Sequence, residues 1–339
     1  MIYKPFQDLK LSALGLGCMR LPWHGETDAE IDVAQTKEML AWAMAHGVNY
    51  YDTAWGYHYG NSETVLGELL KDYPRDSFYL ATKFPGYDLS NMDKVEEIFE
   101  KQLEKLQVDY FDFYLFHNVC ELNIEQYLDP KYGILDYLLK QKQNGRIRHL
   151  GFSVHGSNDT LRRFLDAYGE HMEFCQIQLN YVDWSFQAAE EKVQILRDHG
   201  IPVWVMEPLR GGKLAALPEK QTETLRALRP DETTPGWAFR FLQSIPDVTV
   251  VLSGMSDMEQ LKQNIATFET DAPLNDTEKA ALFAIADELT SSKSVPCTAC
   301  RYYKRPGACI GCRSCEAVCP QQIKISEVFA DFSANVKPF

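Results

Sequence analysis

Short runs of consecutive apolar residues recur along the chain, and most of them are rich in β-branched or aromatic residues. Strands that are covered on both faces have this continuous apolar pattern. We therefore predict eight strands, which fall at 14–17, 48–52, 78–83, 110–117, 147–153, 174–179, 202–206 and 248–253.

Helical patterns lie between these runs. In the first of them, Met39, Leu40, Ala43 and Met44 form one apolar stripe, and Gly47 is placed to end the helix. A last helix follows the eighth strand, with Asn275 or Asp276 as its cap. The pattern predicts further helices at 62–70, 95–106, 135–142, 160–168, 188–199, 237–242 and 277–289.

Strand–helix alternation of this kind over about 250 residues is typical of a (β/α)₈ barrel, an α/β fold. The alternative is a doubly wound open sheet, whose nucleotide site needs the pattern G-x-G-x-x-G after the first strand. Here Gly15 and Gly17 are followed by Arg20 at the third glycine position. We therefore favour the barrel and interpret the two glycines as a tight backbone turn.

The chain has 339 residues, which suggests a large domain and a small one. We predict a barrel over 1–289 and a small module over 290–339, with a linker at 290–294. Of the nine cysteines, six lie between Cys297 and Cys319. The second module is therefore expected to depend on its cysteines.

Charge and hydropathy narrow the range of partners. With 34 Lys and Arg against 48 Asp and Glu, the net charge is −14, which argues against nucleic acid and anionic membranes as partners. We find no secretory signal pattern at the N-terminus and no apolar run of about 18 residues. We therefore expect a cytoplasmic protein that acts on a small molecule and has no membrane partner.

Four polar residues lie at or just after the carboxyl ends of successive predicted strands: Asp52, Tyr57, Lys83 and His117. In a barrel these strand ends share one rim, where active sites are built. A lysine ammonium beside a tyrosine lowers the pKa of the phenol from about 10. A carboxylate would keep the lysine charged, and a histidine would orient the substrate oxygen. The set is thus a tuned general acid for a carbonyl oxygen, and a cofactor must supply the hydride.

These residues and their neighbours resemble the aldo/keto reductase superfamily over roughly residues 1–285. The resemblance is carried by Asp52-Thr53-Ala54-Trp55-Gly56-Tyr57, Tyr59-Gly60-Asn61-Ser62-Glu63, Leu66-Gly67, Thr82-Lys83 and Phe116-His117. It implies an oxidoreductase that uses NADPH or NADH, with Tyr57 as general acid/base and a carbonyl or alcohol substrate. The alternatives are an electron-transfer protein and a non-catalytic nucleotide-binding subunit; the intact set of four argues against the latter.

The resemblance also implies positions that contact the cofactor. Ser153 and Gln176 correspond to carboxamide contacts, although Gln178 and Asn180 compete with Gln176. The loop that wraps the pyrophosphate corresponds to Met206, Leu209, Gly211 and Gly212, and the adenosine end to Ser253, Gly254, Ser256, Gln263 and Asn264. Met206 stands where many members have an aromatic ring stacked on nicotinamide. Gly254 and Gln260 stand where NADPH-dependent members place basic residues, so the choice between NADH and NADPH stays open.

Aromatic side chains in the predicted strand-to-helix loops have two interpretations. Trp23, Trp55, Tyr87 and Trp184 either shape the mouth of the pocket or pack within their loops. The isolated cysteines Cys18, Cys120 and Cys175 are interpreted as packing residues.

Cys309, Cys312, Cys315 and Cys319-Pro320 have the spacing C-x₂-C-x₂-C-x₃-C-P of bacterial ferredoxins. We expect these four thiolates to hold one 4Fe-4S cluster, with tetrahedral zinc as the alternative. Cys297 and Cys300 begin a second motif, which Tyr303 interrupts, and either could replace one ligand. The tail resembles that of the ferredoxin-containing branch of the aldo/keto reductases. The cluster would either carry electrons, with an electron-transfer partner, or only hold the tail.

Overall fold

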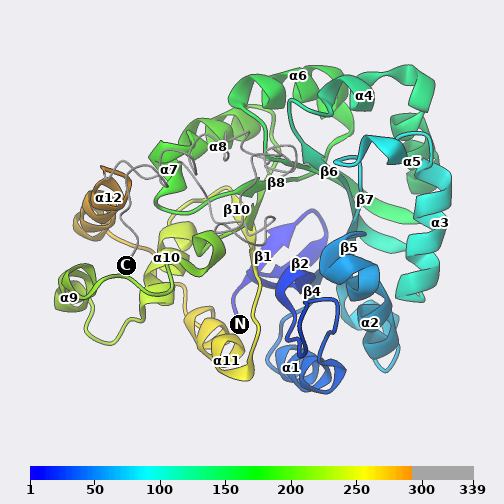
Figure 1. The fold of residues 1–339 in the computed structure, drawn as a ribbon. Coiled ribbons are helices and arrows are strands. Elements are labelled where there is room, and N and C mark those ends of the chain that lie inside the picture. The colour runs from blue at the N-terminus through cyan, green and yellow to red at the C-terminus, as the bar shows by residue number, and fades with distance from the viewer. Residues whose placement is uncertain (292–339) are drawn as a thin grey trace, which may run out of the picture.

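Eight parallel strands close into a barrel in a computed structural model that describes residues 1–291 (Figure 1). The barrel closes where β10 pairs with β3, so the predicted (β/α)₈ barrel is confirmed and the open sheet is excluded. Every strand of the barrel overlaps one predicted run: β3 Leu14–Gly17, β4 Tyr50–Asp52, β5 Tyr79–Phe84, β6 Phe111–Val119, β7 Ile147–Val154, β8 Cys175–Gln178, β9 Val203–Met206 and β10 Val248–Ser253.

A ring of helices covers the outside of the barrel (Figure 1). Their apolar faces pack on the strands; α6, for example, buries Leu161, Phe164 and Leu165. The helices are α1 Val33–Ala45, α2 Asn61–Leu70, α3 Val95–Leu106, α5 Ile134–Gln143, α6 Asn158–Tyr168, α8 Ala189–Asp198, α10 Thr234–Gln243, α11 Met258–Thr267 and α12 Asp276–Ser291. Three further helices were not predicted: α4 Ile124–Leu128, α7 Asp183–Phe186 and α9 Glu219–Leu228.

The end of α12 corrects one boundary. The helix continues through Thr290 and Ser291, so the first two residues of the predicted linker are helical. The rest of that linker, and the whole cysteine cluster, lie outside the described residues.

One end of the barrel is closed by a hairpin that the sequence pattern did not predict. The hairpin consists of β1 (Tyr3–Phe6) and β2 (Leu9–Ser12). Phe6 inserts among Phe113, Phe174 and Trp204, with ring centroids 5.7, 6.4 and 5.1 Å away. These rings lie near the amino ends of their strands, so only the carboxyl ends of the barrel open into a cavity.

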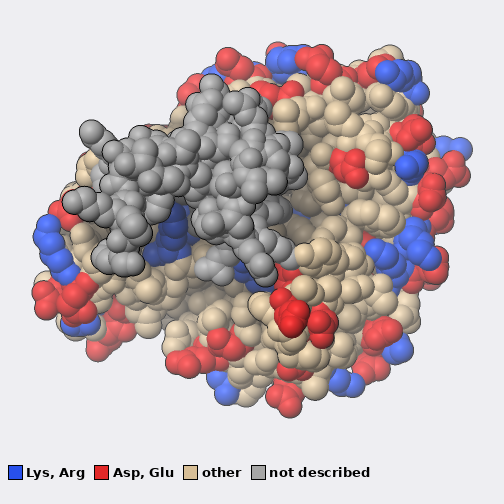
Figure 2. Space-filling model, in the orientation of Figure 1, with Lys and Arg blue, Asp and Glu red and all other residues tan. Residues whose placement is uncertain are grey.

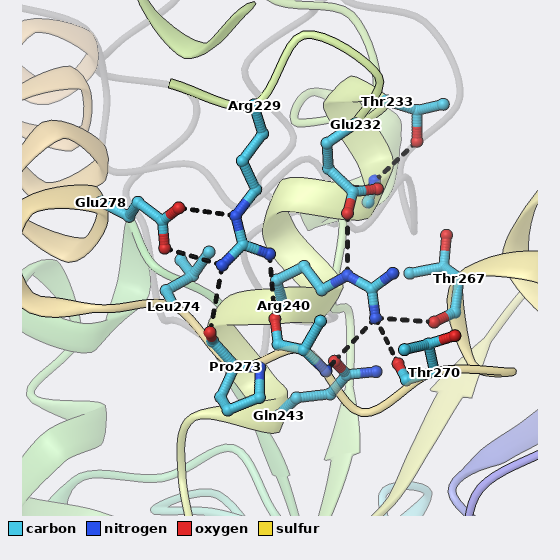
Figure 3. Close-up of polar contacts among 12 residues, drawn as sticks. Arg229, Glu232, Thr233, Arg240, Gln243, Thr267, Thr270, Pro273, Leu274 and Glu278 are labelled. Atoms are coloured by element: carbon cyan, nitrogen blue, oxygen red, sulfur yellow. Dashed lines mark hydrogen bonds and ion pairs between the residues drawn. The ribbon is translucent and has the colours of Figure 1, made fainter.

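Two arginines connect the outer helices behind that cavity (Figure 3). Arg240 on α10 donates to Glu232 at 2.8 Å and to the carbonyl oxygen of Thr267, the last residue of α11, also at 2.8 Å. Arg229 pairs with Glu278 at the start of α12, at 2.6 and 2.7 Å. Arg240 thus joins α10 to the end of α11, and Arg229 joins the end of α9 (Glu219–Leu228) to α12.

Acidic and basic side chains are interspersed around the edge of the face drawn in Figure 2. Within residues 1–291, no helix is both long enough and apolar enough to span a membrane.

Candidate active site

The four predicted catalytic residues meet at the carboxyl ends of neighbouring strands. Asp52 is the last residue of β4, Lys83 lies in β5 and His117 lies in β6. Tyr57 begins the short 3₁₀ helix η2 (Tyr57–Gly60) directly after β4. Asp52, Tyr57 and His117 line one cavity, and Lys83 lies beneath it. The convergence expected from a shared rim is thus present.

Lys83 is the buried centre of this group, with 0% of its surface exposed. Its Nζ donates to Asp52 Oδ1 at 2.6 Å and to the Thr53 carbonyl oxygen at 2.7 Å. The same Nζ lies 5.1 Å from the centroid of the Tyr57 ring. Burial raises the pKa of the Asp52 carboxyl, and the Lys83 ammonium opposes that rise. The ammonium therefore lies between a carboxyl group that holds it and a phenol ring that it can polarise.

A strained turn places Tyr57 in this position. The two residues after it, His58 and Tyr59, have φ of 52° and 56°, which non-glycine residues rarely adopt. His58 accepts from Leu21 N–H at 3.1 Å through Nε2, and its protonated Nδ1 donates to the Asp28 carbonyl oxygen at 2.5 Å. Backbone strain of this kind persists where the surroundings fix it, commonly at functional sites.

A β-bulge places His117. Phe116 pairs with Phe152, whereas Val119 pairs with Val154, so β6 contains one residue more than β7 over this stretch. Within the bulge, Asn118 has a positive φ of 58°, and its backbone N–H donates to Ser153 Oγ at 2.7 Å. Bulges re-aim side chains next to active sites. The His117 ring lies 6.0 Å from the Tyr57 ring at 81°.

The environment of His117 keeps the imidazole neutral. Burial lowers its pKa well below the ordinary 6.5, and the nearby Lys83 ammonium lowers it further. A neutral imidazole has one N–H donor and one acceptor nitrogen. His117 can therefore orient a substrate oxygen by hydrogen bonding near neutral pH.

A cavity of about 500 Å³ extends from these residues to α11. All the positions expected to contact a cofactor line it: Ser153, Gln176, Met206, Leu209, Gly211, Gly212, Ser253, Gly254, Ser256, Gln263 and Asn264. Small-molecule and cofactor cavities are typically about 300–1,000 Å³.

The structure distinguishes Gln176 from Gln178 and Asn180, the two alternatives for the carboxamide contact. Gln178 and Asn180 both donate to Asp183 Oδ2, at 2.8 and 2.7 Å. Gln176 lines the cavity, and its Oε1 is buried without a partner among the described residues. Of the three amides, Gln176 is therefore the one whose oxygen is available to a ligand.

The loop after β9 has an unusual backbone. Glu207 and Arg210 have φ of 53° and 49°, and the glycines Gly211 and Gly212 have φ of 64° and 93°. Successive backbone N–H groups in such turns form concave sites for anions. A diphosphate is the anion that this loop would suit.

At the far end of the cavity, the chain after β10 lies against the chain after β3. Ser256 Oγ donates to the Arg20 carbonyl oxygen at 2.9 Å, and Asn264 donates to Ser253 Oγ at 3.1 Å. A Cβ added to Gly254 would lie 3.1 Å from Arg20 Cβ, so glycine allows this close approach. Asp257, and not Ser256, caps α11.

Three charged or titratable residues of the cavity were not predicted as site residues: Arg20, His155 and Glu207. Burial and the nearby Asp183 raise the pKa of Glu207 to about 7, although Arg20 and Arg210 oppose the rise. Arg20 interrupts the glycine pattern, His155 comes two residues after Ser153, and Glu207 directly follows Met206. The only sequence signal for these three residues was that each stands close to an expected contact or motif.

The four loop aromatics are not among the described residues that line the cavity. Trp55 lies under the Lys105 ammonium at 4.3 Å, and Trp184 packs on Phe241 at 5.6 Å. Tyr87 contacts the ring of His117, one of the predicted catalytic residues, at 5.2 Å. Of the two interpretations of these aromatic residues, packing within the loops therefore fits most of them better than shaping the mouth of the pocket.

The isolated cysteines Cys18, Cys120 and Cys175 are buried and free, as packing residues should be. Residues 1–291 contain no cluster of His, Cys, Asp and Glu that could hold a metal ion. Of the remaining cysteines, Cys297 and Cys300 and the predicted ligands Cys309, Cys312, Cys315 and Cys319 lie outside the described residues.

Comparisons with known proteins show the family of the chain. A family model described as the aldo/keto reductase family matches residues 13–287. An NADH-specific methylglyoxal reductase of Escherichia coli is 25% identical and covers 83% of this chain and 97% of its own. An uncharacterized oxidoreductase of Bacillus subtilis, YqkF, is 26% identical and covers 76% of this chain and 87% of its own.

Solved structures have the same fold. The holo form of aldo-keto reductase AKR11C1 from Bacillus halodurans is 25% identical and aligns with a TM-score of 0.69, covering 84% of this chain and 96% of its own. An aldo-keto reductase from Klebsiella pneumoniae in complex with NADPH is 22% identical and aligns with a TM-score of 0.64. The alignment covers 85% of this chain and 95% of the other. The chain therefore belongs to the aldo/keto reductase family and is an enzyme of the oxidoreductase class.

Proposed function

We propose that this enzyme transfers hydride between a nicotinamide dinucleotide and a carbonyl or alcohol substrate, with Tyr57 as the general acid/base. The observation that carries the proposal is the position of the Lys83 ammonium. It lies 2.6 Å from Asp52 Oδ1 and 5.1 Å from the Tyr57 ring centroid, next to the cavity that Tyr57 lines. A cation in this position favours the phenolate over the phenol.

Each of the four residues has a distinct part in reduction. Tyr57 gives its proton to the carbonyl oxygen while the carbonyl carbon accepts hydride. Lys83 stabilises the phenolate that forms, and Asp52 holds Lys83 in place. His117, kept neutral by burial, hydrogen-bonds the same oxygen and orients the substrate. In alcohol oxidation the phenolate takes the proton back.

The residues that line the cavity fit a nicotinamide dinucleotide, which supplies or accepts the hydride when it is bound. The unpaired Gln176 Oε1 and the Ser153 hydroxyl would hold the carboxamide, and Met206 would pack on the nicotinamide ring. The glycine loop at 209–212 would hold the diphosphate. Ser253, Gly254, Ser256, Gln263 and Asn264 would hold the adenosine end.

Both NADH and NADPH are candidates. One relative is described as NADH-specific and one solved structure contains NADPH. Arg20 lines the adenosine side of the cavity, where its cation would favour a 2′-phosphate. Dissociation constants of the two reduced dinucleotides, measured by protein fluorescence, decide between them. Methylglyoxal, which that relative is named for, is the first substrate to test.

Tyr57→Phe tests the proposal directly. We expect carbonyl reduction to fall by about 10²–10⁴-fold, as for the loss of a general acid, with the dinucleotide dissociation constant unchanged. His46→Phe is the control, because within residues 1–291 the His46 ring bonds the Trp42 carbonyl oxygen and stacks on Trp42, away from the cavity. Full turnover in Tyr57→Phe would refute the role of Tyr57.

We also propose that Cys309, Cys312, Cys315 and Cys319 hold one 4Fe-4S cluster, because their spacing and Pro320 match a ferredoxin motif. Anaerobic protein should contain about four iron and four sulfide ions per chain, and Cys312→Ser should lose them. Zinc without sulfide would contradict the cluster. Reductive titration followed by electron paramagnetic resonance distinguishes an electron carrier from a structural cluster.

A further inference from the structure

The cavity contains a second buried imidazole, which the proposed mechanism does not use. His155 directly follows β7, and it lines the cavity together with Tyr57 and His117. The backbone N–H of His155 donates to the Val119 carbonyl oxygen at 3.0 Å, which continues the pairing of β7 with β6. Since alternate strand residues point to one side, His155 lies on the side of Ser153, one step nearer the mouth.

The ring of His155 has no protein partner among residues 1–291. No hydrogen bond joins either ring nitrogen to a described residue, and Nδ1 is buried without a partner. Buried polar groups are normally paired, and an unpaired one needs a physical reason. In a ligand cavity, the simplest reason is that the ligand supplies the partner.

A buried lysine lies near the His155 imidazole, as Lys83 lies near His117. Lys192 on α8 is 8% exposed, and its Nζ donates to the Gly156 carbonyl oxygen at 2.7 Å. Burial and the Lys192 ammonium lower the pKa of His155 to about 3. The cavity therefore holds two neutral imidazoles, each able to give or accept one hydrogen bond.

The two imidazoles lie at neighbouring strand ends. Val119 of β6 pairs with Val154 of β7, which places the residues around them, His117 and His155, on adjacent strands of one rim. In the proposed reaction His117 and Tyr57 contact the carbonyl oxygen, and Ser153 and Gln176 hold the cofactor carboxamide. His155 then remains for another polar atom of the substrate.

We infer that His155 hydrogen-bonds an oxygen on the carbon next to the reacting carbonyl, so that the substrates are α-hydroxy or α-oxo carbonyl compounds. This inference rests on the proposed function, and it adds a substrate class and a specificity-determining residue. A methyl group in place of that oxygen would leave the imidazole unpaired, which is how a polar site rejects an apolar analogue.

Two matched aldehydes test the inference. Lactaldehyde and 2-methylpropanal differ by a hydroxyl in place of a methyl group of similar size. With the full-length enzyme, we expect kcat/KM to favour lactaldehyde by about tenfold or more, the value of one hydrogen bond. His155→Phe should remove most of that preference, and His155→Gln, which keeps hydrogen-bonding atoms, should restore part of it.

Two controls accompany the variants. His199→Phe removes an imidazole that, among the described residues, bonds the Ile195 carbonyl oxygen and does not line the cavity, so it should keep the wild-type preference. Dinucleotide binding, measured by fluorescence, should be unchanged in all variants. Because His155→Gln is polar and similar in length, it provides a folded variant if His155→Phe is unstable.

The outcomes are distinct. An unchanged preference in both His155 variants overturns the inference and leaves the proposed function in place. An equal loss for both aldehydes, or weaker dinucleotide binding, also overturns it, because His155 would then support the fold or the cofactor. A wild-type enzyme that reduces no carbonyl compound with either nicotinamide overturns the proposed function and this inference with it.

Discussion

At the residue scale, the Lys83–Asp52 pair is the contact on which the site depends. Both side chains are buried, with 0% of Lys83 and 3% of Asp52 exposed, so removing one partner leaves the other buried and uncompensated. We predict that Lys83→Met lowers the free energy of unfolding by about 3–5 kcal/mol, the usual cost of breaking a buried ion pair.

Adding Asp52→Asn to that variant should recover much of the loss, because no unpaired carboxyl group remains. Neither variant should reduce carbonyl compounds, since both lack the ammonium. Urea denaturation and turnover assays measure the two effects. A double variant less stable than Lys83→Met would show that the pair is not the origin of the cost.

Glu207 gives the site a dependence on pH. Its pKa is raised from 4.5 to about 7, mainly by burial, so the folded chain keeps a proton that the unfolded chain has lost. Stability should therefore fall as pH rises from about 4.5 to 7, and this contribution should then stay constant.

The neutral variant Glu207→Gln should be more stable than the wild type by about 1–3 kcal/mol at pH 8 and about equally stable at pH 4.5. Thermal denaturation at the two pH values measures this difference. Glu219→Gln is the matched control, because its side chain is 73% exposed. A gain for Glu207→Gln that is the same at both pH values would contradict the titration of Glu207.

Sequence predicted the residues that lie at strand ends better than those in loops. Asp52, Lys83 and His117 were expected together because the barrel brings strand ends to one rim. Arg20 and Glu207 were not. Arg20 ends a short 3₁₀ helix that approaches Gly254 closely, and Glu207 has a positive φ, and neither feature can be read from residue types. His155 was missed because it lies one residue beyond the end of β7.

At the element scale, the two arginines behind the cavity are predicted to control α11. Arg240 is 7% exposed and donates to Glu232, Gln243 and the carbonyl oxygens of Thr267 and Thr270 (Figure 3). Arg240→Met should lower the free energy of unfolding by about 2–4 kcal/mol, because several buried acceptors lose their donor.

The same change should weaken dinucleotide binding several-fold, since α11 carries Gln263 and Asn264 into the cavity. Arg226→Met is the control, because Arg226 is 57% exposed. Urea denaturation and fluorescence titration of the dinucleotide measure the two effects. A loss of stability with unchanged affinity would show that α11 keeps its position without the arginine.

Barrel strands were predictable because most of their residues are apolar or buried, as β10 (Val248–Ser253) shows with six buried residues. The β1–β2 hairpin was not, because its strands contain no apolar run, and in β2 apolar and polar residues alternate. Its role depends on Phe6 filling the barrel interior, which only the closed barrel creates. The bulge at Asn118 was likewise not predictable, since it depends on the register with β7.

At the scale of the whole molecule, the cavity joins elements that are distant in sequence. Its lining comes from β3, β4, β6, β7, β8, β9, β10 and α11, so a ligand bound there contacts most of the barrel. Dinucleotide at about 100 times its dissociation constant should therefore stabilise the folded enzyme by about 2.7 kcal/mol. Differential scanning calorimetry measures this as a higher Tm, and an unchanged Tm would contradict dinucleotide binding.

The central claim is that hydride passes from nicotinamide to a carbonyl carbon in this cavity. The most direct measurement is a single turnover of the full-length enzyme with methylglyoxal and NADH or NADPH carrying deuterium at both C4 positions. We predict that one deuterium appears on the reduced carbon of the product, as nuclear magnetic resonance would show. Product without deuterium at that carbon, or no product with either dinucleotide, would contradict the claim.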